Sequence, residues 1–561
     1  MTTRLLVLSC ALLLALPAAA QEAAAEEEAA STDEAAAGES EAEYGSADAA
    51  GEADDGEAGA KAPLEPPGED AEVKERLAYW DSVELPPPNV PEGVKRRPPL
   101  SDFDRRTKRA QKPFSVIGVP QLGGNPDLGF IVGAVSAVTW HSTPEADPYY
   151  DFTPFDRRII AQAQVSLKRR PDILARQDYQ VRFIAPYWLD TLMYLDLAAR
   201  YLENASAQYF GTDSSTMGSL QELGPAGRVD SLNSFMTTSG VSSYDTQAFD
   251  TDFGSFGDYN TALRELRDAD DPSLQPYTFA QYHQYLYRQP MLIGSLRYAL
   301  FGGLLTPAVT LNLSKVFIER YDGREIRVSK DERGNSAPTL LDLDCAEGIA
   351  KHCDGTWDNT IKLSLALDTR DFAADPKKGF LVDVSYEAAP EFLGSPGYQR
   401  VTGSGHFYIN PFLAAGMESK YLRMVIAGRV VYSVQGGDMP FYARNRLSFF
   451  DRNADGLGGI SSMRGYRLNR FVGNVMTVAN LEIRYDIYSF NTKRSTIAFK
   501  LVPHLDAGGA YDSVSDTNLG ELRLSGGGGL YLQWNQSNVI RLDIGYGDEG
   551  MSFGINYGFM Y

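Results

Sequence analysis

The sequence predicts an all-β protein: a 16-stranded antiparallel transmembrane β-barrel with a disordered acidic N-terminal tail. Three observations predict this fold class. Apolar and polar residues alternate strictly in the C-terminal segments. Many of these segments reach the length of about ten residues that a tilted spanning strand needs. An export signal opens a chain that contains no later run of about 20 apolar residues, so a spanning helix is excluded and a closed barrel is favoured.

Residues 1–20 have the features of a signal peptide. Arg4 supplies the positive start, residues 5–16 form the apolar core, and the alanines at 18–20 fit a cleavage site. Cys10 would fit a lipoprotein signal, but the apolar run before it is too short, so ordinary cleavage is favoured. The mature chain is therefore expected to be exported.

Residues 21–93 are predicted to be an acidic and Pro-rich disordered segment in the periplasm. Residues 21–70 hold 17 acidic side chains and one basic one, with almost no aromatic or β-branched residues. Such a segment cannot bury enough apolar surface to offset the entropy of ordering it. One short helix is expected over 71–85, and prolines keep residues 85–100 extended. The net charge of −22 is therefore mainly a property of this segment, and it argues against a nucleic-acid partner.

Residues 94–112 form a basic linker whose charge has two interpretations. Two acids, Asp102 and Asp104, stand among eight bases, which are Lys95, Arg96, Arg97, Arg105, Arg106, Lys108, Arg109 and Lys112. The linker is either a solvated connection, or a strip that lies against anionic lipid headgroups or the rim of the barrel.

Residues 113–561 carry the alternating pattern of the barrel. In the last eleven residues one face holds Met551, Phe553, Ile555, Tyr557, Phe559 and Tyr561. The other face holds Ser, Gly and Asn, with Met560 as the single exception. A soluble β-sandwich also alternates. Charge and Gly on the second face, with aromatic residues near strand ends, favour a membrane barrel that has a polar lumen.

Sixteen strands are predicted, and an even number places both termini on the periplasmic side. Their ranges are 113–121, 128–141, 156–170, 176–186, 191–203, 289–300, 307–319, 359–368, 379–389, 400–411, 420–434, 475–489, 495–509, 521–534, 538–547 and 551–561. This count makes 204–288, 320–358 and 435–474 long extracellular loops, of which the last is the sixth.

Four motifs follow one another in the C-terminal half. The sixth loop contains Gly-Gly-Ile-Ser-Ser-Met-Arg-Gly-Tyr at 458–466, and the next strand contains Ala-Asn-Leu-Glu-Ile-Arg-Tyr at 479–485. Leu-Asp-Ala-Gly-Gly occupies 505–509, and Asp-Thr-Arg-Asp at 368–371 precedes Pro-Lys-Lys-Gly at 376–379. With these motifs the sequence resembles the BamA/TamA-like bacterial surface antigen superfamily of outer-membrane β-barrel proteins. The resemblance rests on motifs in 359–561 and only on the alternating pattern of apolar and polar residues in 113–300.

The resemblance implies a location in the bacterial outer membrane and a role in inserting or translocating proteins, or in some members lipids. Client outer-membrane proteins or lipids would then be its partners, in contact with outer-membrane lipid. In such members the first and last strands pair weakly and open sideways, and Pro120 in the first strand fits this because it cannot donate to the ladder.

The sequence departs from the family at its N-terminal end. Such proteins usually carry periplasmic POTRA domains before the barrel, and residues 21–112 contain no recognisable one. Two functions remain open. One is an insertase or translocase whose periplasmic partner is another chain that docks on the tail, and the other is a passive pore or structural barrel without insertase activity.

A loop latch is predicted in the lumen. In the family the Arg-Gly-Phe/Tyr motif tips the sixth loop, which folds back into the lumen, and here that motif is Arg464, Gly465 and Tyr466. Strand parity turns Glu482 and Asp506 inward on adjacent strands, where both carboxylates are available to one guanidinium. Gly465 permits a close backbone approach. The alternative is an ordinary loop arginine in water.

Cys345 and Cys353 are the cysteines left after cleavage, and they lie in one predicted extracellular loop. In an oxidising compartment this spacing favours a local disulfide, while a metal site with His352 is the alternative. Residues 451–456 mimic the start of a calcium loop, but Ser462 stands where the bidentate Glu should be, so no metal is predicted.

No enzyme and no cofactor are predicted. The five histidines are scattered, no Gly-x-Ser-x-Gly elbow is present, and lumen Ser, His and Asp residues are more often polar wall groups than a catalytic triad.

Overall fold

A computed structural model gives the architecture. It describes residues 68, 71–94, 99–100, 102–125, 128–167, 174–236, 245–249, 252–266, 277–278, 281–321, 325–327, 333–371, 373, 375–414, 424–450, 452–491, 496–534, 538–557 and 559–561. The predicted signal peptide and the most acidic part of the predicted tail lie outside these residues.

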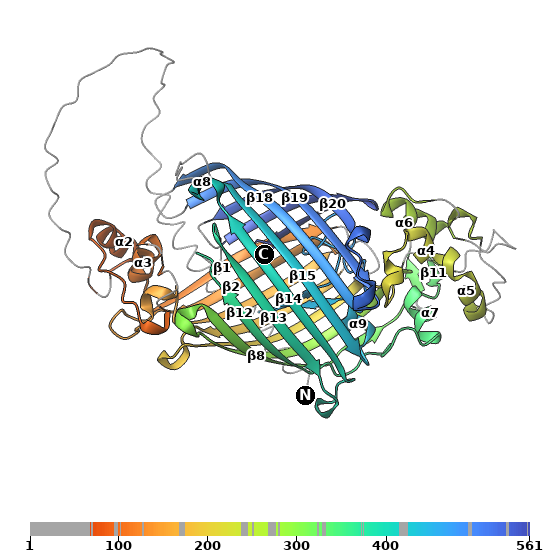
Figure 1. Cartoon of the computed structure of the whole chain (residues 1–561), viewed down its shortest axis with the longest axis horizontal. Coiled ribbons are helices and arrows are strands. Elements are labelled where there is room, and N and C mark those ends of the chain that lie inside the picture. The colour runs from red at the N-terminus through yellow and green to blue at the C-terminus, as the bar shows by residue number, and fades with distance from the viewer. Residues whose placement is uncertain are drawn as a thin grey trace, which may run out of the picture. The chain divides into compact units, whose positions relative to one another are not determined.

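Sixteen antiparallel strands form a closed barrel, as the sequence predicts (Figure 1). They are β1 (Phe114–Asn125), β2 (Gly129–Trp140), β3 (Arg157–Leu167), β4 (Leu174–Ala185), β5 (Met193–Gln208), β7 (Gln284–Tyr298), β8 (Leu305–Ser314), β12 (Thr360–Asp368), β13 (Gly379–Ala389), β14 (Tyr398–Ile409), β15 (Met424–Gly437), β18 (Val475–Asn491), β19 (Thr496–Tyr511), β20 (Arg523–Trp534), β21 (Asn538–Gly547) and β22 (Gly550–Tyr557). Each predicted strand overlaps one of them.

The prediction for the end of the chain was wrong. The last strand was expected to run to residue 561 with Phe559 and Tyr561 facing lipid, but β22 ends at Tyr557. Met560 is buried, and the hydroxyl of Tyr561 donates to the carbonyl of Ala427 on β15 at 3.1 Å. The final residues therefore turn into the lumen, where arginine side chains offer better partners than lipid does.

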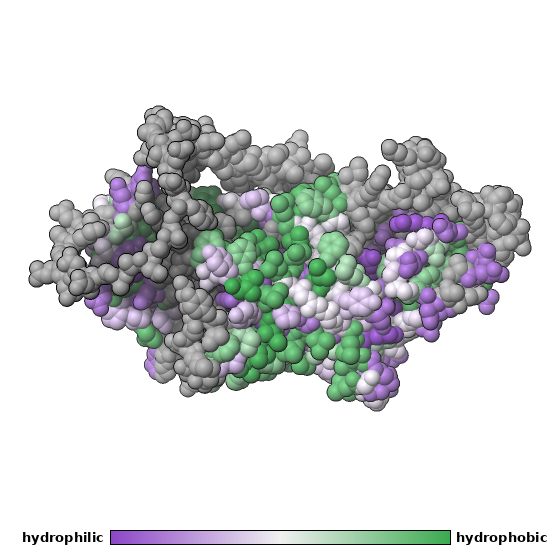
Figure 2. All heavy atoms as spheres, turned by 90° about the horizontal axis from the view of Figure 1, so that it is seen from above, coloured by the Kyte–Doolittle hydropathy of each residue, from purple (hydrophilic) through white to green (hydrophobic). Residues whose placement is uncertain are grey.

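The outer wall of the barrel is apolar, and its inner wall is polar. Figure 2 shows hydrophobic residues gathered over the wall. In the middle of β18, Leu481, Ile483 and Tyr485 are exposed, while Glu482 and Arg484 between them are buried. This is the period of two that a strand imposes. Among the described residues, no helix is long and apolar enough to cross a membrane.

The long connections lie at one end of the barrel, which we call the loop end. They contain η4 (Ser214–Met217), α4 (Leu220–Leu223), η5 (Pro225–Arg228), α5 (Val229–Met236), η6 (Gln247–Phe249), α6 (Phe256–Glu265), β6 (Tyr277–Thr278), β9 (Phe317–Glu319), β10 (Glu325–Arg327), β11 (Arg333–Ser336), α7 (Leu340–Ala346), η8 (Glu391–Leu393), α9 (Phe441–Arg444), β16 (Arg446–Ser448), β17 (Asn453–Asp455), η9 (Val514–Asp516) and η10 (Leu519–Glu521). The opposite end holds shorter connections with η2 (Tyr150–Phe152), η3 (Trp188–Asp190), η7 (Phe301–Gly303) and α8 (Pro411–Ala414).

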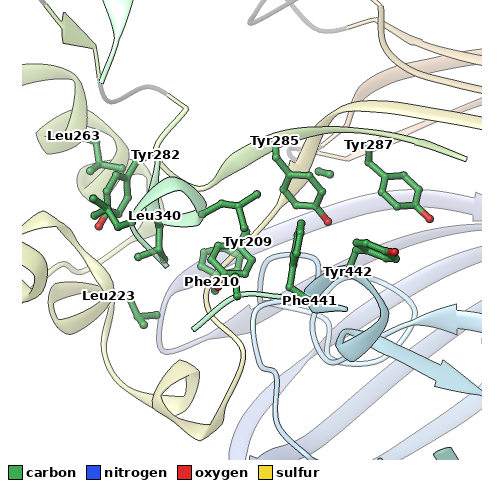
Figure 3. Close-up of a cluster of buried hydrophobic side chains, with 14 of the residues drawn as sticks. Tyr209, Phe210, Leu223, Leu263, Tyr282, Tyr285, Tyr287, Leu340, Phe441 and Tyr442 are labelled. Carbon is green, nitrogen blue, oxygen red and sulfur yellow. The ribbon is translucent and has the colours of Figure 1, made fainter. Parts of the chain in front are cut away.

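A hydrophobic core forms in these loops and extends to the loop ends of β5, β7, β13 and β14. It joins the described parts of 209–283 and 315–359 to residues 439–443, and we call this assembly the cap. Figure 3 shows Tyr209, Phe210, Leu340 and Phe441 packed within it. The cap thus has a packed interior that continues onto residues of the barrel wall.

A small helical unit precedes the barrel. It contains α2 (Val73–Ser82), which agrees with the helix expected over 71–85, and the end of α3 (Asp102–Ala110), which the sequence did not predict. Arg106 donates to the carbonyl of Val83 at 2.9 Å, and the guanidinium of Arg109 lies 5.7 Å from the ring centre of Trp80. Two basic residues of the linker, Arg106 and Arg109, therefore join the end of α3 to α2. The short η1 (Glu92–Val94) lies between α2 and α3.

Candidate functional site

The connection between β15 and β18, residues 438–474, carries the predicted latch. It runs through the hairpin β16–β17 and places Met463, Arg464 and Tyr466 among the most buried side chains of the chain. A loop arginine that is 0% exposed must find its hydrogen-bond partners within the protein.

Arg464 is held by the two carboxylates that strand parity turned inward. Its Nε and Nη2 donate to Asp506 at 2.8 and 2.7 Å, and its Nη1 donates to Glu482 at 2.7 Å. The backbone N–H of Arg464 also donates to Asp506, at 3.0 Å. Asp543 on β21 lies 3.6 Å from Nη1. Charge-assisted bonds of this kind are the strongest hydrogen bonds in proteins.

A second layer of polar groups holds these carboxylates. Asn480, opposite Asp506 in the β18–β19 register, donates to Asp506 at 2.8 Å. Arg484 donates to the other oxygen of Glu482 at 2.9 Å, and Tyr531 donates to Asp543 at 3.0 Å. The carboxylates are therefore fixed in place by their own strands and by β20.

Gly465 lies where the chain approaches β21 most closely. Its φ is +108°, and a Cβ built there would stand 2.8 Å from the backbone nitrogen of Gly547. Its N–H donates to the hydroxyl of Ser552 on β22 at 2.8 Å. A side chain here would be strained and would collide with backbone.

Tyr466 completes the motif. Its hydroxyl donates to the carbonyl of Leu524 on β20 at 3.0 Å, and its ring meets Phe471 edge to face at 4.9 Å. A Cβ at Gly547 would stand 2.9 Å from the Tyr466 ring. The tyrosine therefore fills a space that a glycine on β21 leaves open.

Other glycines on the last strands also make room for the loop, and this was missed in the sequence. A Cβ at Gly508 would meet Met463 at 2.5 Å, one at Gly545 would meet the backbone of Arg464 at 2.5 Å, and one at Gly554 would meet Ile460 at 2.7 Å. The sequence alone suggests that these small residues face a polar lumen. In fact these glycines shape a groove for the loop, and their clustering on the last four strands was the available signal.

Arg470 is a further buried cation that the sequence did not single out. Its Nε donates to Glu549 in the β21–β22 turn at 2.6 Å, and its Nη2 donates to the carbonyl of Gly218 in the cap at 2.8 Å. Thr216 accepts a third bond from Nη1. Burial raises the pKa of Glu549, and the neighbouring Arg470 opposes that rise. One guanidinium thus joins the sixth loop, the cap and the turn that begins β22.

Cys345 and Cys353 are bonded to each other in the cap. His352 lies beside them, but its Nε2 is 2.9 Å from Asp438. Within the described residues, no group of three or more His, Cys, Asp and Glu side chains is arranged to hold a metal. In the calcium-like segment, Asp451 is outside those residues, and the amide of Asn453 donates to Glu387 at 2.9 Å.

The seam is the contact between the first and last strands. Among the residues that the structure describes, β1 and β22 share a single paired position, Gly124 opposite Ile555. By contrast, β1 pairs with β2 from Phe114 to Asn125, and β22 pairs with β21 from Gly550 to Tyr557. The seam therefore has far fewer ladder bonds than the neighbouring strand pairs.

Comparison with known proteins gives a family match. The model of the Omp85 superfamily domain matches residues 175–559. None of the curated proteins matches the chain. Among solved structures, BamA from Haemophilus ducreyi lacking POTRA domains 1–3 is 11% identical with a TM-score of 0.41, over 80% of this chain and 70% of that one. CdiB from Escherichia coli is 10% identical with a TM-score of 0.43, over 79% and 62%. CdiB from Acinetobacter baumannii is 11% identical with a TM-score of 0.37, over 80% and 60%. The chain thus spans less than two thirds of either CdiB chain.

Proposed function

Since the chain belongs to the Omp85 superfamily of outer-membrane insertion and translocation barrels, we propose that it inserts or translocates client polypeptides by opening sideways at the seam. Its place is the bacterial outer membrane. Members of the superfamily are insertion or translocation barrels and not enzymes, and they handle outer-membrane proteins or lipids.

The observation that carries this proposal is the single paired position between Gly124 and Ile555. A strand edge with unpaired N–H and C=O groups is a template on which another strand can pair. Pro120, in the middle of β1, removes one donor from that edge. A client strand could therefore add to β1 or β22 at little cost in existing hydrogen bonds.

We propose further that Arg464, Gly465, Tyr466, Glu482 and Asp506 form the latch that keeps the sixth loop inside the barrel. The contact of Gly465 with Ser552, and of Ile460 with Gly554, supports a role in steadying β22 from within. The latch would hold the inner face of β22 while its edge stays free.

A disulfide across the seam tests lateral opening. Continuing the antiparallel register from Gly124 and Ile555 places Gly123 opposite Asn556, so Gly123→Cys with Asn556→Cys should lock the seam under oxidation. The matched control is Ile544→Cys with Phe553→Cys, which links two strands that are already fully paired. Both variants keep the native disulfide.

The readout is insertion of a model outer-membrane barrel into proteoliposomes that contain the purified chain. We expect the oxidised seam variant to lose insertion and to regain it on reduction, while the control is active in both states. Insertion that is unchanged by the locked seam would overturn the proposal. Planar-bilayer conductance, run alongside, tests the passive pore.

The acidic segment 21–93 is proposed to recruit a periplasmic protein. Its charge supports this, because a strongly acidic segment steers a basic partner towards it. Affinity capture with segment 21–112 from periplasmic extract should retain such a protein. Capture that persists after the acids are replaced by Gln and Asn would contradict a charge-based contact.

A further inference from the structure

A basic cavity lies in the lumen beside the latch. Its volume is about 510 Å³, and eight cationic side chains and three carboxylates line it. A polar cavity with this excess of one charge sign attracts ions of the other sign.

Five of these cations form ion pairs with carboxylates, and one of the five is Arg541. The other pairs join Arg182 to Asp196, Arg176 and Arg200 to Asp178, and Arg446 to Asp358. The positive charge that remains unbalanced is therefore confined to a smaller set of residues.

Arg429 and Arg452 belong to that set. Arg429 is 3% exposed, and its Nε and Nη2 donate to the side chain of Asn480 and the carbonyl of Ser461, which are neutral groups. Arg452 is exposed to the lumen, and it repels Arg429 electrostatically. Within the described part of the chain, neither guanidinium lies within ion-pair distance of a carboxylate.

Arg541 is paired with a carboxylate and gives independent support of another kind. It is 2% exposed, and the Oδ2 of Asp543 lies 3.4 Å from its Nη1. Even so, its Nε and Nη1 make no hydrogen bond to any described residue. Buried donors without acceptors are costly, and a ligand with several oxygens would satisfy them.

The basic cavity continues towards the seam. A second cavity of about 230 Å³ shares Arg176, Asp455, Ser461, Leu468 and Asn556 with it. Apolar residues, among them Leu122, Ile131 and Ile555, line that cavity together with polar ones such as Gln164 and Asp178. A basic cavity that adjoins apolar side chains at the seam fits a molecule with an anionic head and an apolar tail.

We propose that the cavity lined by Arg429, Arg452 and Arg541 binds a phosphate group, carried by a lipid whose apolar part lies at the seam. Guanidinium groups suit a phosphate, because their forks match its oxygens and its charge exceeds that of a carboxylate. Free phosphate is the other possible source of the same chemistry. The site goes beyond polypeptide insertion.

Native mass spectrometry of the full chain in phospholipid-free detergent tests the site. The probes are dipalmitoyl phosphatidic acid, dipalmitoylglycerol, which has the same chains without phosphate, and inorganic phosphate. The variants are Arg452→Gln, which removes an exposed side chain outside the latch, and Arg541→Gln. The matched control is Arg157→Gln, whose side chain is 62% exposed and outside both cavities. The difference in gel mobility between heated and unheated samples shows whether each variant is folded.

We expect one phosphatidic acid per barrel, bound more tightly than dipalmitoylglycerol. Arg452→Gln should weaken that binding by about tenfold, as the loss of a charge-assisted hydrogen bond does, while Arg157→Gln binds like the wild type. Inorganic phosphate that binds alone with the same arginine dependence would support the site and identify free phosphate as the source. Equal binding of the two lipids, or phosphatidic acid binding unaffected by both cavity variants, would overturn the proposal.

Discussion

The guanidinium of Arg464 donates two parallel hydrogen bonds to the carboxylate of Asp506, from Nε to Oδ2 at 2.8 Å and from Nη2 to Oδ1 at 2.7 Å. The two residues are 42 positions apart and 0% exposed. A planar fork of this kind fixes direction as well as distance. The sixth loop can therefore sit in the lumen in one position, with its tip against β19.

Arg464→Ala should release the loop. It leaves Glu482 and Asp506 buried without their cation, and breaking one side of a buried pair costs about 3–5 kcal/mol. We expect a lower unfolding temperature on heat-modified gels and new protease cleavage within 456–474. Arg452→Ala in the same loop is the control and should change neither. A protease-resistant loop in the Arg464→Ala barrel would contradict the latch.

Gly465→Ala tests the backbone approach separately from charge. The added Cβ meets the backbone of β21, and the positive φ is strained for alanine, so a cost of about 1–3 kcal/mol is expected. Gly436→Ala is the control, since a Cβ there has no atom within 4 Å. Comparing the melting temperatures of the two variants measures the effect, and equal values would mean that the loop tip has room to move.

Replacing Cys345 and Cys353 by Ser should loosen the cap and spare the barrel. The bond closes a segment with a sequence separation of 8, for which loop-closure entropy gives about 2–3 kcal/mol. We expect faster proteolysis within 333–359 and an unchanged barrel melting temperature. Reductant should produce the same change in the wild type and none in the variant. A fall in barrel melting temperature would show that the cap supports the wall.

The cap should lose stability in acid through His283. Its Nδ1 donates to the carbonyl of Tyr209 at 2.9 Å, and its Nε2 lies 2.7 Å from the hydroxyl of Tyr259, from which a neutral ring accepts. Burial lowers the pKa of His283 from 6.5 to about 3, and Arg470 adds to that effect. The unfolded cap takes up a proton below pH 6.5 that the folded cap refuses, so stability falls as pH drops from 6.5 towards 3.

The expected loss is about 1.4 kcal/mol for each pH unit crossed. Proteolysis of the cap at a series of pH values measures it, with an acid-stable protease. His283→Asn should be less stable at neutral pH but should show a flatter profile. An identical acid profile in the variant would assign the pH dependence to other groups.

The sequence predicted the barrel because alternation on strands is local. Leu481, Glu482 and Ile483 show which face is wet without reference to any distant residue. The inward carboxylates Glu482 and Asp506 followed from the same parity. Strand parity could not identify the partners of side chains that enter the lumen from a loop.

Long-range partners were therefore found only in the structure. Arg470 reaches Gly218 across 252 positions, and no local pattern indicates such a contact. The inward turn after Tyr557 was missed for a related reason, because Phe559 continues the alternation although Arg484, which contacts its ring at 4.3 Å, draws it inside. The alternation of apolar and polar residues cannot show whether an aromatic ring faces lipid or packs against a buried arginine.

Arg470 couples the cap to the strand that borders the seam. The same side chain holds Gly218 in the cap and Glu549 at the start of β22, and the backbone N–H of Phe256 on α6 donates to the carbonyl of Glu549 at 3.0 Å. A ligand that displaced the cap from the barrel would have to break these bonds. Before they broke, the displacement would exert a force on the start of β22, which borders the seam. A ligand bound to the cap would therefore act on the edge of β22 through these bonds.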